Sequence, residues 1–414
     1  MDFDKPLIFI SFRVGRLGGV MAEYAEDKLR VLEKLGITTF VVTSLASLPN
    51  DRKGVRYYRI PSISWSEFSK QINSLKIRNQ PIPWPALFFY PVSFTLGRLF
   101  DKFLLKKLGS SPGGNWSWSL MCLPVVFFLS LKYRIRGLFA TGSASAGLVG
   151  AVVFRTLKAQ FFYEIPDPLI GSTMARNPLQ LKRIRRLERF LILNSTRTVF
   201  NSNVAASDAI ARNQDLADKI YTIYPGAWAF PHYGNEQPRS KFTFVHLGSL
   251  YGSRNLDLFF SALEHVIEED SLNSSNFQVV NVGHMNEDQI NRYSSVVDFI
   301  SIPNLEREQA IEFAINCNVL LLIQHEDSRS AESIPFKIYD YLNLNLPIIS
   351  ILDNSEILDL LGEYSELASK IKDLDRLKQS IRKSLAWNED KRETQESSID
   401  STQQFLSILE GKAD

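Results

Sequence analysis

The sequence has little cysteine, and its two copies, Cys122 and Cys317, stand far apart without the spacing of metal ligands. Their scarcity argues against a disulfide framework and against structural zinc, and it favours a reducing compartment. A secretory signal is also lacking, because the first apolar run, Leu7 to Ser11, is short and follows acidic residues. The strongly apolar run Trp116 to Leu131 contains Pro124 and falls short of the roughly 20 residues that a spanning helix needs. We therefore expect a cytoplasmic protein.

The composition indicates a folded protein of two domains. A chain of 414 residues is too long for one ordinary core, and 45% hydrophobic with 22% charged residues is typical of folded chains. The net charge of +2 conceals an asymmetry: residues 1–240 hold 32 Lys+Arg against 16 Asp+Glu, a net of +16, and residues 241–414 hold 15 against 29, a net of −14. The basic half predicts an anionic partner, which is a membrane surface, a phosphorylated acceptor or a nucleic acid.

The start of the chain predicts a parallel α/β sheet. An apolar strand at Leu7–Ile10 runs into a glycine-rich loop that ends at Gly18 and Gly19, and a helix with helical apolar spacing follows from Val20. Gly36 ends that helix before a strand at 38–43. Ligands of such sheets bind at the carboxyl ends of the strands, where this loop lies. A plain tight turn is the alternative interpretation of the glycines.

Residues 60–135 interrupt this pattern with aromatic and basic residues in alternation. Such side chains suit the headgroup depth of a bilayer, so this insert predicts an interfacial surface. The alternative is an ordinary helical insert with its aromatic residues in the core. Within it, we expect Trp116 to Leu131 to form a buried helix.

Further along the first half, two acids follow a strand predicted at 159–163. Glu164 and Asp167 would then lie at a carboxyl end, where a site is expected, although Asp167 can equally cap a turn. A basic helix at 182–189 suits an anionic surface, with a solvated face as the alternative.

The second half repeats the α/β pattern after a polar linker at 227–240. Strands are predicted at 242–247, 277–283, 299–303 and 319–323, with a glycine-containing loop at 248–253 and helices between the strands. The expected organisation is a first domain at 1–230 that carries the 60–135 insert and a second domain at 241–385. Residues 386–414 are expected to form a last helix, which can cross back to the first domain. Two doubly wound Rossmann-like domains that face each other across a cleft account for this order.

The stretch from Ser330 to Tyr341 brings two acids to one predicted helix. Glu332 precedes Pro335, which suits a first helical turn, and Asp340 lies inside the helix. The unpaired N–H groups of a helix start suit a phosphate, and an acid on the helix can reach the hydroxyls of a ribose. This order predicts a sugar-nucleotide site, although paired acids are often only solvated or salt-bridged.

Together these segments resemble the retaining, metal-independent glycosyltransferases of the GT-B fold, especially glycosyltransferase family 4. The resemblance covers most of the chain except 60–135. It implies that Gly18 and Gly19 contact a donor diphosphate, that Glu332 contacts the transferred sugar, and that Asp340 binds the ribose. It also implies a donor site with Arg254 and Lys337 as phosphate cations and with further contacts at Gly248, Ser249, Pro303, Ser333, Ile334 and Pro335.

The chain departs from that family at three positions. Asp340 stands where glutamate is usual, Ser249 where arginine is common, and no histidine follows Thr141. His246 sits in a predicted strand and is expected in the core, whereas His284 and His325 are weaker candidates for substrate contact. Lys337 can alternatively form a surface ion pair with Asp340.

The expected function is transfer of a sugar from a UDP-, GDP- or dTDP-linked donor to a hydroxyl of a lipid-linked or polysaccharide acceptor. Glu164, Asp167 and Thr141 are the acceptor-side candidates, and no metal or other cofactor is expected because no Asp-x-Asp pair stands at a strand end in the usual manner. The enzyme would act in cell-surface glycan synthesis at the inner face of the plasma membrane. The alternatives are a nucleotide-sugar epimerase of the same fold, a catalytically silent membrane-associated binding protein, and a nucleic-acid binder.

Overall fold

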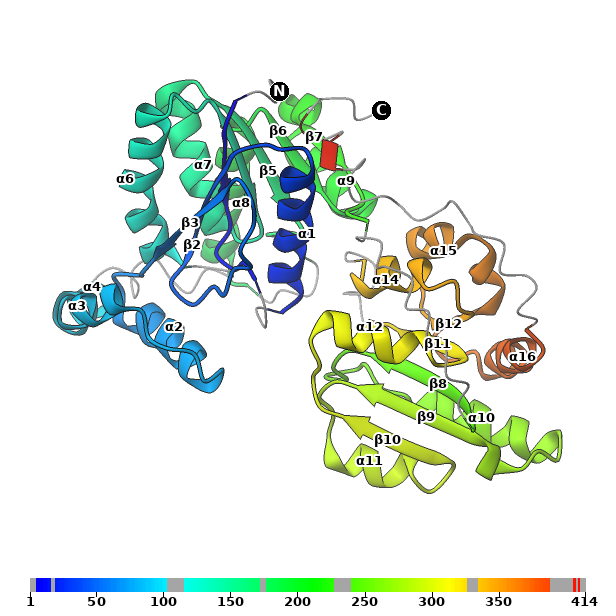
Figure 1. Cartoon of the computed structure of the whole chain (residues 1–414). Helices are drawn as coiled ribbons and strands as arrows, with labels where there is room; N and C mark the ends of the chain where they lie inside the picture. The colour runs from blue at the N-terminus through cyan, green and yellow to red at the C-terminus, as the bar shows by residue number, and fades with distance from the viewer. Residues whose placement is uncertain are drawn as a thin grey trace. The chain divides into compact units, whose positions relative to one another are not determined.

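The structure is a computed structural model that describes residues 5–15, 19–102, 115–171, 176–226, 240–325, 334–387, 405–406 and 409. The chain divides into two compact units, one of residues 1–225 with 401–414 and one of residues 226–400. Each unit is a parallel sheet flanked by helices (Figure 1).

The first unit is built on a sheet with seven strands among its described residues, in the order β3-β2-β1-β4-β5-β6-β7. The pairings between neighbours are all parallel. The strands are β1 (Leu7–Ile10), β2 (Thr39–Ser44), β3 (Val55–Ile60), β4 (Gly137–Thr141), β5 (Gln160–Ile165), β6 (Arg197–Phe200) and β7 (Ile220–Thr222). Because the winding direction reverses between β1 and β4, a topological switch point lies between these two strands.

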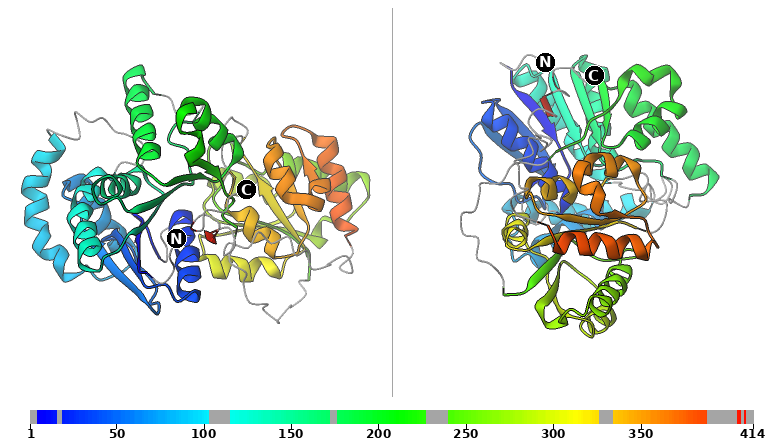
Figure 2. Two further views of the ribbon diagram at one scale, coloured as in Figure 1. Left: turned by 90° about the horizontal axis from the view of Figure 1, so that it is seen from above. Right: turned by 90° about the vertical axis from the view of Figure 1, so that its right-hand side faces the viewer.

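Helices cover both faces of this sheet, with α1 on the opposite face from α6, α7 and α8 (Figures 1 and 2). Between β3 and β4 the chain forms a group of short helices in place of a single crossover helix. The helical segments are α1 (Val20–Lys34), α2 (Trp65–Ile77), α3 (Trp84–Val92), the π-helical η1 (Ser93–Gly97), α4 (Arg98–Phe100), α6 (Trp116–Lys132), α7 (Ala144–Leu157), α8 (Pro178–Leu193), α9 (Asn203–Arg212) and η3 (Gln214–Lys219).

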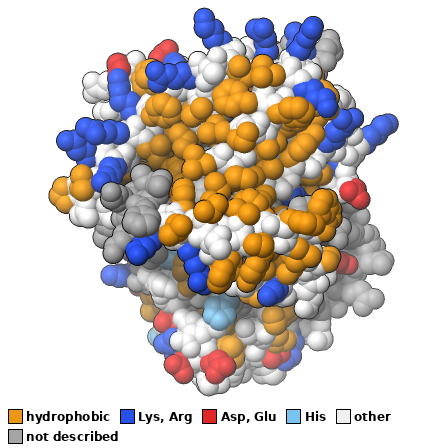
Figure 3. Space-filling view, turned by 90° about the vertical axis from the view of Figure 1, so that its left-hand side faces the viewer, with side chains coloured by type: hydrophobic (Ala, Val, Ile, Leu, Met, Phe, Trp, Pro, Cys, Tyr) orange, Lys and Arg blue, Asp and Glu red, His pale blue; other side chains and the backbone are white. Residues whose placement is uncertain are grey.

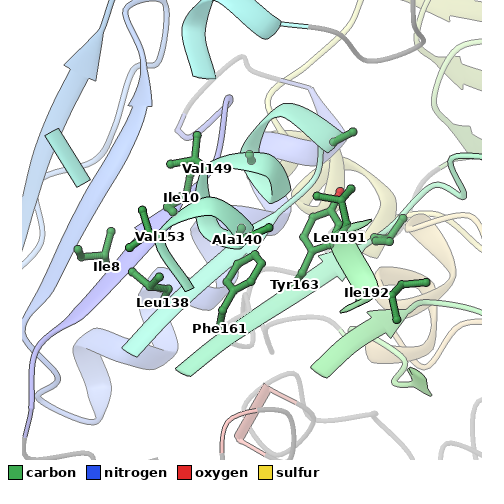
Figure 4. Packing of buried hydrophobic residues seen from close by; sticks show 14 of the residues in the cluster. Ile8, Ile10, Leu138, Ala140, Val149, Val153, Phe161, Tyr163, Leu191 and Ile192 are labelled. Carbon is green, nitrogen blue, oxygen red and sulfur yellow. The ribbon is translucent and has the colours of Figure 1, made fainter. Parts of the chain in front are cut away.

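The core of the first unit forms where alternate strand residues meet α6, α7 and α8. Figure 4 shows Ile8, Leu138 and Phe161 of three neighbouring strands beneath Val149 and Val153 of α7. Helix α7 approaches the sheet closely because it carries glycine at the contact: a Cβ on Gly150 would lie 2.1 Å from the Phe161 ring. This explains the run of small residues that the sequence has there.

The opposite face of the same sheet receives a residue from the far end of the chain. Phe9 and Phe139 stack on that face with ring centroids 5.4 Å apart, and Phe405 meets Phe139 edge-on at 5.0 Å. Phe405 is 2% exposed. The C-terminal residues therefore group with the first unit and complete its core.

The second unit repeats the same topology on a smaller scale. Its six described strands run in the order β10-β9-β8-β11-β12-β13, with the switch point between β8 and β11. They are β8 (Phe242–Leu247), β9 (Phe277–Val282), β10 (Asp298–Ile302), β11 (Val319–Ile323), β12 (Ile348–Ile351) and β13 (Ala368–Ser369). The helical segments are α10 (Asp257–Glu269), η4 (Ser274–Asn276), α11 (Glu287–Tyr293), α12 (Arg307–Ile315), α14 (Lys337–Asn343), α15 (Ser355–Leu361), η5 (Gly362–Leu367) and α16 (Leu374–Leu385).

Three expectations from the sequence need correction. The segment 116–131 is helical as predicted but not buried throughout, since Leu120, Phe128 and Leu131 of α6 are exposed. Glu164 lies inside β5, whose predicted end at 163 was too early. Strand β3 was not predicted, because its half-buried edge position leaves no clear apolar pattern.

The close packing of α7 gives a stability prediction. Replacing Gly150 by valine inserts side-chain atoms into the space of the Phe161 ring, and overpacking of this kind should lower the free energy of unfolding by roughly 2 kcal/mol. Arg155→Val on the exposed side of the same helix is the matched control and should change it by less than about 0.5 kcal/mol. Urea unfolding measures both, and equal stability of the two variants would contradict the packing argument.

Candidate functional site

In the first unit, a recess lies at the switch point between β1 and β4. It has a volume of about 320 Å³ and is lined where β1, β4 and β5 end and where α1, α6 and α7 begin. The polar lining residues include Ser11, Arg13, Asn115, Thr141 and Asp167. Parallel strands bring these segments together because their carboxyl ends share one edge of the sheet.

Glu164 is held in an ion pair inside the first unit. Its carboxylate is 3.1 Å from the Lys28 ammonium and accepts a hydrogen bond of 2.6 Å from the Thr141 hydroxyl. Glu164 is 1% exposed. Burial lowers the pKa of Lys28, and the carboxylate of Glu164 opposes that shift. Glu164 therefore ties α1 to β5, whereas Thr141 lines the recess itself.

Asp167 is the acid of the first unit that lines the recess. Its side chain is exposed at the rim, while the surrounding atoms remove part of its hydration and raise the pKa of its carboxyl above the usual range. An aspartate in this setting can hydrogen-bond a hydroxyl that enters the recess. The structure thus brings Thr141 and Asp167 to one site and places Glu164 behind it.

In the second unit, two glycine turns pack directly against each other at the switch point. Gly248 follows β8 and Gly283 follows β9, and a Cβ on Gly283 would lie 2.4 Å from the carbonyl atoms of Gly248. Both glycines have positive φ, at 119° and 150°. No side chain fits at Gly283, and the backbone at Gly248 is exposed beside the Lys337 ammonium at the start of α14.

A buried hydrogen-bonded chain ends at this loop. The Lys337 ammonium donates to His246 Nε2 at 2.5 Å and to the Leu247 carbonyl at 3.1 Å. His246 Nδ1 then donates to the Asn281 side-chain oxygen at 2.7 Å, and the Asn281 amide donates to the Gly283 carbonyl at 2.9 Å. This arrangement fixes His246 as a neutral imidazole that accepts from Lys337.

Lys337 has no acidic partner among the residues that the structure describes. Burial lowers the pKa of its ammonium far below the usual value, and the nearby charge of Arg254 lowers it further. Burial also lowers the pKa of His246, followed by the charge of Lys337. A lysine that lies beside a second cation and has no acidic partner among the described residues forms a place where an anion would be stabilised.

Asp340 has a strong ionic partner that the sequence did not reveal. Arg307 at the start of α12 forms a bidentate ion pair with it. Arg307 Nη2 donates to one carboxylate oxygen at 2.6 Å, and Nε donates to the other at 3.1 Å. Both side chains are largely buried. Lys337 therefore does not form the surface ion pair with Asp340 that the sequence left open. A ribose bound at Asp340 would share the carboxylate with Arg307.

The remaining predicted positions fall into two groups. Gly19 caps the start of α1, Ser249 follows Gly248, Ile334 and Pro335 stand just before Phe336, the N-cap of α14, and Pro303 follows β10. Gly18, Glu332 and Ser333 lie outside the described residues. His246 is buried as expected, His284 is exposed, and His325 lies beside Ser253, with 3.2 Å between Nδ1 and Oγ.

Sequence reasoning missed Arg307 and the link between His246 and Lys337. Arg307 stands 33 residues before Asp340, and His246 stands 91 residues before Lys337. The available signal was a histidine that interrupts the apolar strand Phe242–Leu247, since a polar residue inside a buried strand needs a partner.

Two kinds of feature are absent from the described residues. No cluster of three or more histidine, cysteine, aspartate or glutamate side chains in that part of the chain is placed to hold a metal ion. Within the same residues, no helix combines the length and apolar character required to cross a membrane.

The buried histidine gives a pH prediction. His246 stays neutral in the folded protein but protonates below about pH 6.5 when unfolded, so its unfolded form binds more protons at low pH. His246 should therefore contribute a loss of folding stability as the pH falls below 6.5, with a slope that approaches about 1.4 kcal/mol per pH unit. His246→Gln should flatten this dependence, and His265→Gln, at an exposed position of α10, should not. Urea unfolding between pH 5 and 7 measures both, and parallel curves for the two variants would contradict a neutral His246.

Comparison with known proteins places the fold. No protein-family model and no curated protein sequence matches the chain. Among solved structures, it is similar to a UDP-forming α,α-trehalose-phosphate synthase from Burkholderia xenovorans, with TM-score 0.62, 11% identity, and 98% of this chain and 99% of that chain covered. It is also similar to the E. coli trehalose-6-phosphate protein (TM-score 0.58, 11% identity, 99% and 96% covered). A glycosyltransferase from Rickettsia africae is a third (TM-score 0.57, 10% identity, 99% and 94% covered). The chain thus has the GT-B fold of two Rossmann-like units; membership of family 4 stays a prediction.

Proposed function

We propose that the protein transfers a sugar from a nucleotide-sugar donor to an acceptor hydroxyl with retention of configuration. The observation that carries this proposal is the partly buried Lys337, whose ammonium contacts the buried His246, has no acidic partner among the described residues and lies next to Arg254 at the β8–β11 switch point. An uncompensated cation inside a protein is costly, so its retention points to an anionic ligand that completes the site.

The chemical demand of this reaction matches the site. Breaking the bond between the sugar and the diphosphate leaves negative charge on the departing oxygen, and fixed cations and N–H groups at that point lower the barrier. Lys337, Arg254 and the open backbone at Gly248 would supply that stabilisation, so we propose that no metal takes part. Glu332 would contact the transferred sugar, and Asp340 with Arg307 would bind the ribose.

The acceptor would enter the recess of the first unit, where Thr141 and Asp167 offer hydrogen-bonding groups for a hydroxyl. The B. xenovorans trehalose-phosphate synthase holds glucose-6-phosphate, and the E. coli protein holds UDP-2-fluoro glucose. By analogy we infer a nucleotide-linked donor, with UDP tested first and GDP and dTDP next. The analogy also supports a sugar-bearing acceptor.

We further infer that the acceptor is lipid-linked or a polysaccharide and that the enzyme works at the inner face of the plasma membrane, in cell-surface glycan synthesis. The support is the net charge of +16 in residues 1–240 together with the aromatic and basic residues between 60 and 135. A catalytically silent binding protein of the same fold is the second candidate, favoured by Ser249 at a position where the resembled family commonly has arginine.

A thermal-shift panel of UDP-, GDP-, dTDP-, ADP- and CMP-sugars without metal tests the donor site. A ligand at 100 times its dissociation constant stabilises the native state by about 2.7 kcal/mol, so one nucleotide class should raise the melting temperature. Lys337→Met should abolish this rise, whereas Lys370→Met, at an exposed position of the same unit, should keep it. A flat response across the whole panel would overturn the proposal in favour of the silent relative.

Glu332 separates binding from chemistry. Glu332→Gln should retain the thermal shift with the active nucleotide sugar but lose transfer, because the amide no longer carries the charge that faces the sugar. Asp340→Asn should mainly weaken donor binding, since it removes the charge proposed to bind the ribose and also weakens the ion pair with Arg307. Full turnover by the Glu332 variant, measured as release of nucleoside diphosphate, would be incompatible with its assigned role.

A further inference from the structure

A broad apolar surface covers one side of the first unit. We use "apolar face" for the exposed large side chains of α3, η1, α4 and α6. They are Trp84, Leu87, Phe88, Tyr90, Val92, Phe94, Leu96, Leu99, Leu120, Phe128 and Leu131. Figure 3 shows hydrophobic side chains gathered on this side, with lysine and arginine side chains around their edge. A monomer in water rarely exposes so large an apolar area.

Helix α3 is apolar on every side, which is unusual outside a core or a membrane. Its inner side packs Ala86 and Phe89 against Phe68 of α2. Its outer side exposes Trp84 at 72% and Phe88 at 75%. The burial of one side therefore leaves a second apolar side that the fold does not use.

The face is held firmly to the unit. The Ser93 hydroxyl donates to the Ile63 carbonyl at 2.9 Å, and a Cβ on Gly97 would lie 2.2 Å from the same oxygen. Trp65 meets the rings of Tyr90 and Phe94 edge-on at 5.3 and 5.1 Å. These contacts hold the helices that carry the exposed apolar side chains in place on the first unit.

Charge around the face has one sign. Residues 84–100 contain Arg98 as their single charged residue, and α6 contains Lys132 alone. Arg98 lies over the ring of Phe94 with its guanidinium carbon 3.9 Å from the centroid, and Lys132 lies 5.3 Å from the ring of Phe128. Cations at the margin of aromatic rings occupy the level where lipid phosphates meet the acyl chains.

The neighbouring acids point inward. Asp101 accepts from the Ser64 hydroxyl at 2.6 Å and from the Ser66 N–H at 2.9 Å. Glu67 is buried and accepts from the Ser117 hydroxyl at 2.7 Å at the start of α6. Both acids serve as helix caps, so the outer side keeps its basic rim.

We propose that the apolar face docks onto an anionic lipid bilayer, with α3, η1 and α4 entering the interface and Arg98 and Lys132 binding lipid phosphates. This deepens the membrane partnership of the proposed function by naming the surface, and the binding itself does not require sugar transfer. Charge complementarity selects the bilayer over a second copy, because two basic rims would repel each other.

The docked orientation has a consequence for the acceptor. Asn115 lines the recess and precedes α6, and Leu120 of the apolar face follows five residues later, ~7.5 Å along the helix. Phe12 of the recess also packs edge-on against Trp118 of α6. A lipid-linked acceptor could therefore keep its chains in the bilayer while its polar end reaches Thr141 and Asp167.

Vesicle sedimentation tests the proposal. The full chain should bind vesicles of equimolar phosphatidylcholine and phosphatidylglycerol and should bind phosphatidylcholine vesicles weakly. The triple variant Trp84→Ser, Leu87→Ser, Phe88→Ser should lose binding by about tenfold or more, because it removes three side chains of apolar burial. The control Leu179→Ser with Leu193→Ser, two exposed leucines of α8, should bind as wild type.

Two further measurements test the role of the basic rim and the depth of insertion into the bilayer. Arg98→Glu with Lys132→Glu should remove the preference for phosphatidylglycerol. Lipids with brominated acyl chains should quench the fluorescence of the native protein more than that of Trp84→Phe. Unchanged sedimentation of the triple variant would overturn the proposal. So would a concentration-dependent dimer that the triple variant abolishes without any vesicle binding by the native protein.

The thermal shift with nucleotide sugars distinguishes failure of the docking proposal from failure of the sugar-transfer proposal. The triple variant should show the same shift as the native protein, since the face lies in the first unit and the Lys337 site in the second. Vesicle binding without a thermal shift would overturn the sugar-transfer proposal and leave docking intact. A thermal shift without vesicle binding would overturn the docking proposal and leave the sugar-transfer proposal intact.

Discussion

The reversal of winding in each parallel sheet is the constraint on which both candidate sites depend. Where the chain turns from one side of the sheet to the other, neighbouring strands send their following segments to opposite faces, and the backbone at their carboxyl ends stays uncovered. The recess between β1 and β4 and the glycine turns beside β8 both form at such points. The chemistry of each site is then decided by a few side chains that reach that edge.

The sequence predicted the framework well because strand and helix periodicity is a local property. Strands β1, β8 and β11 have the predicted bounds, and α1 begins at Val20 as expected. The partners of the site residues were not predictable in the same way. The pairing of Asp340 with Arg307 depends on how α12 and α14 pack, which no spacing in the sequence encodes.

Burial was the least predictable property, and α6 shows why. Its residues are apolar on all sides, so the sequence indicates a core helix. The structure buries Trp118, Cys122 and Val126 and leaves Leu120 and Phe128 exposed. An apolar composition indicates that a surface is unfavourable in water, but it does not indicate whether protein or another apolar phase covers that surface.

The charge asymmetry of the chain also has a structural explanation. Several buried acids of the first unit have partners within it. Glu164 pairs with Lys28, Glu188 with Arg212 and Glu26 with Arg52. Glu67 caps the start of α6. The basic helix α8 is meanwhile largely exposed, although Arg189 pairs with Asp215. Each of these ion pairs removes one cation together with one anion, so the excess of lysine and arginine in this half remains for the other basic residues to carry.

The edge-on contact of Phe405 with Phe139 bears on how the protein is made. The first unit needs a residue that is synthesised after the whole of the second unit, so it cannot complete its core before the second unit has been made. Phe139 and Phe9 would stay uncovered throughout synthesis of the second unit. The last contact of this core therefore forms only after the chain has passed through the whole of the second unit.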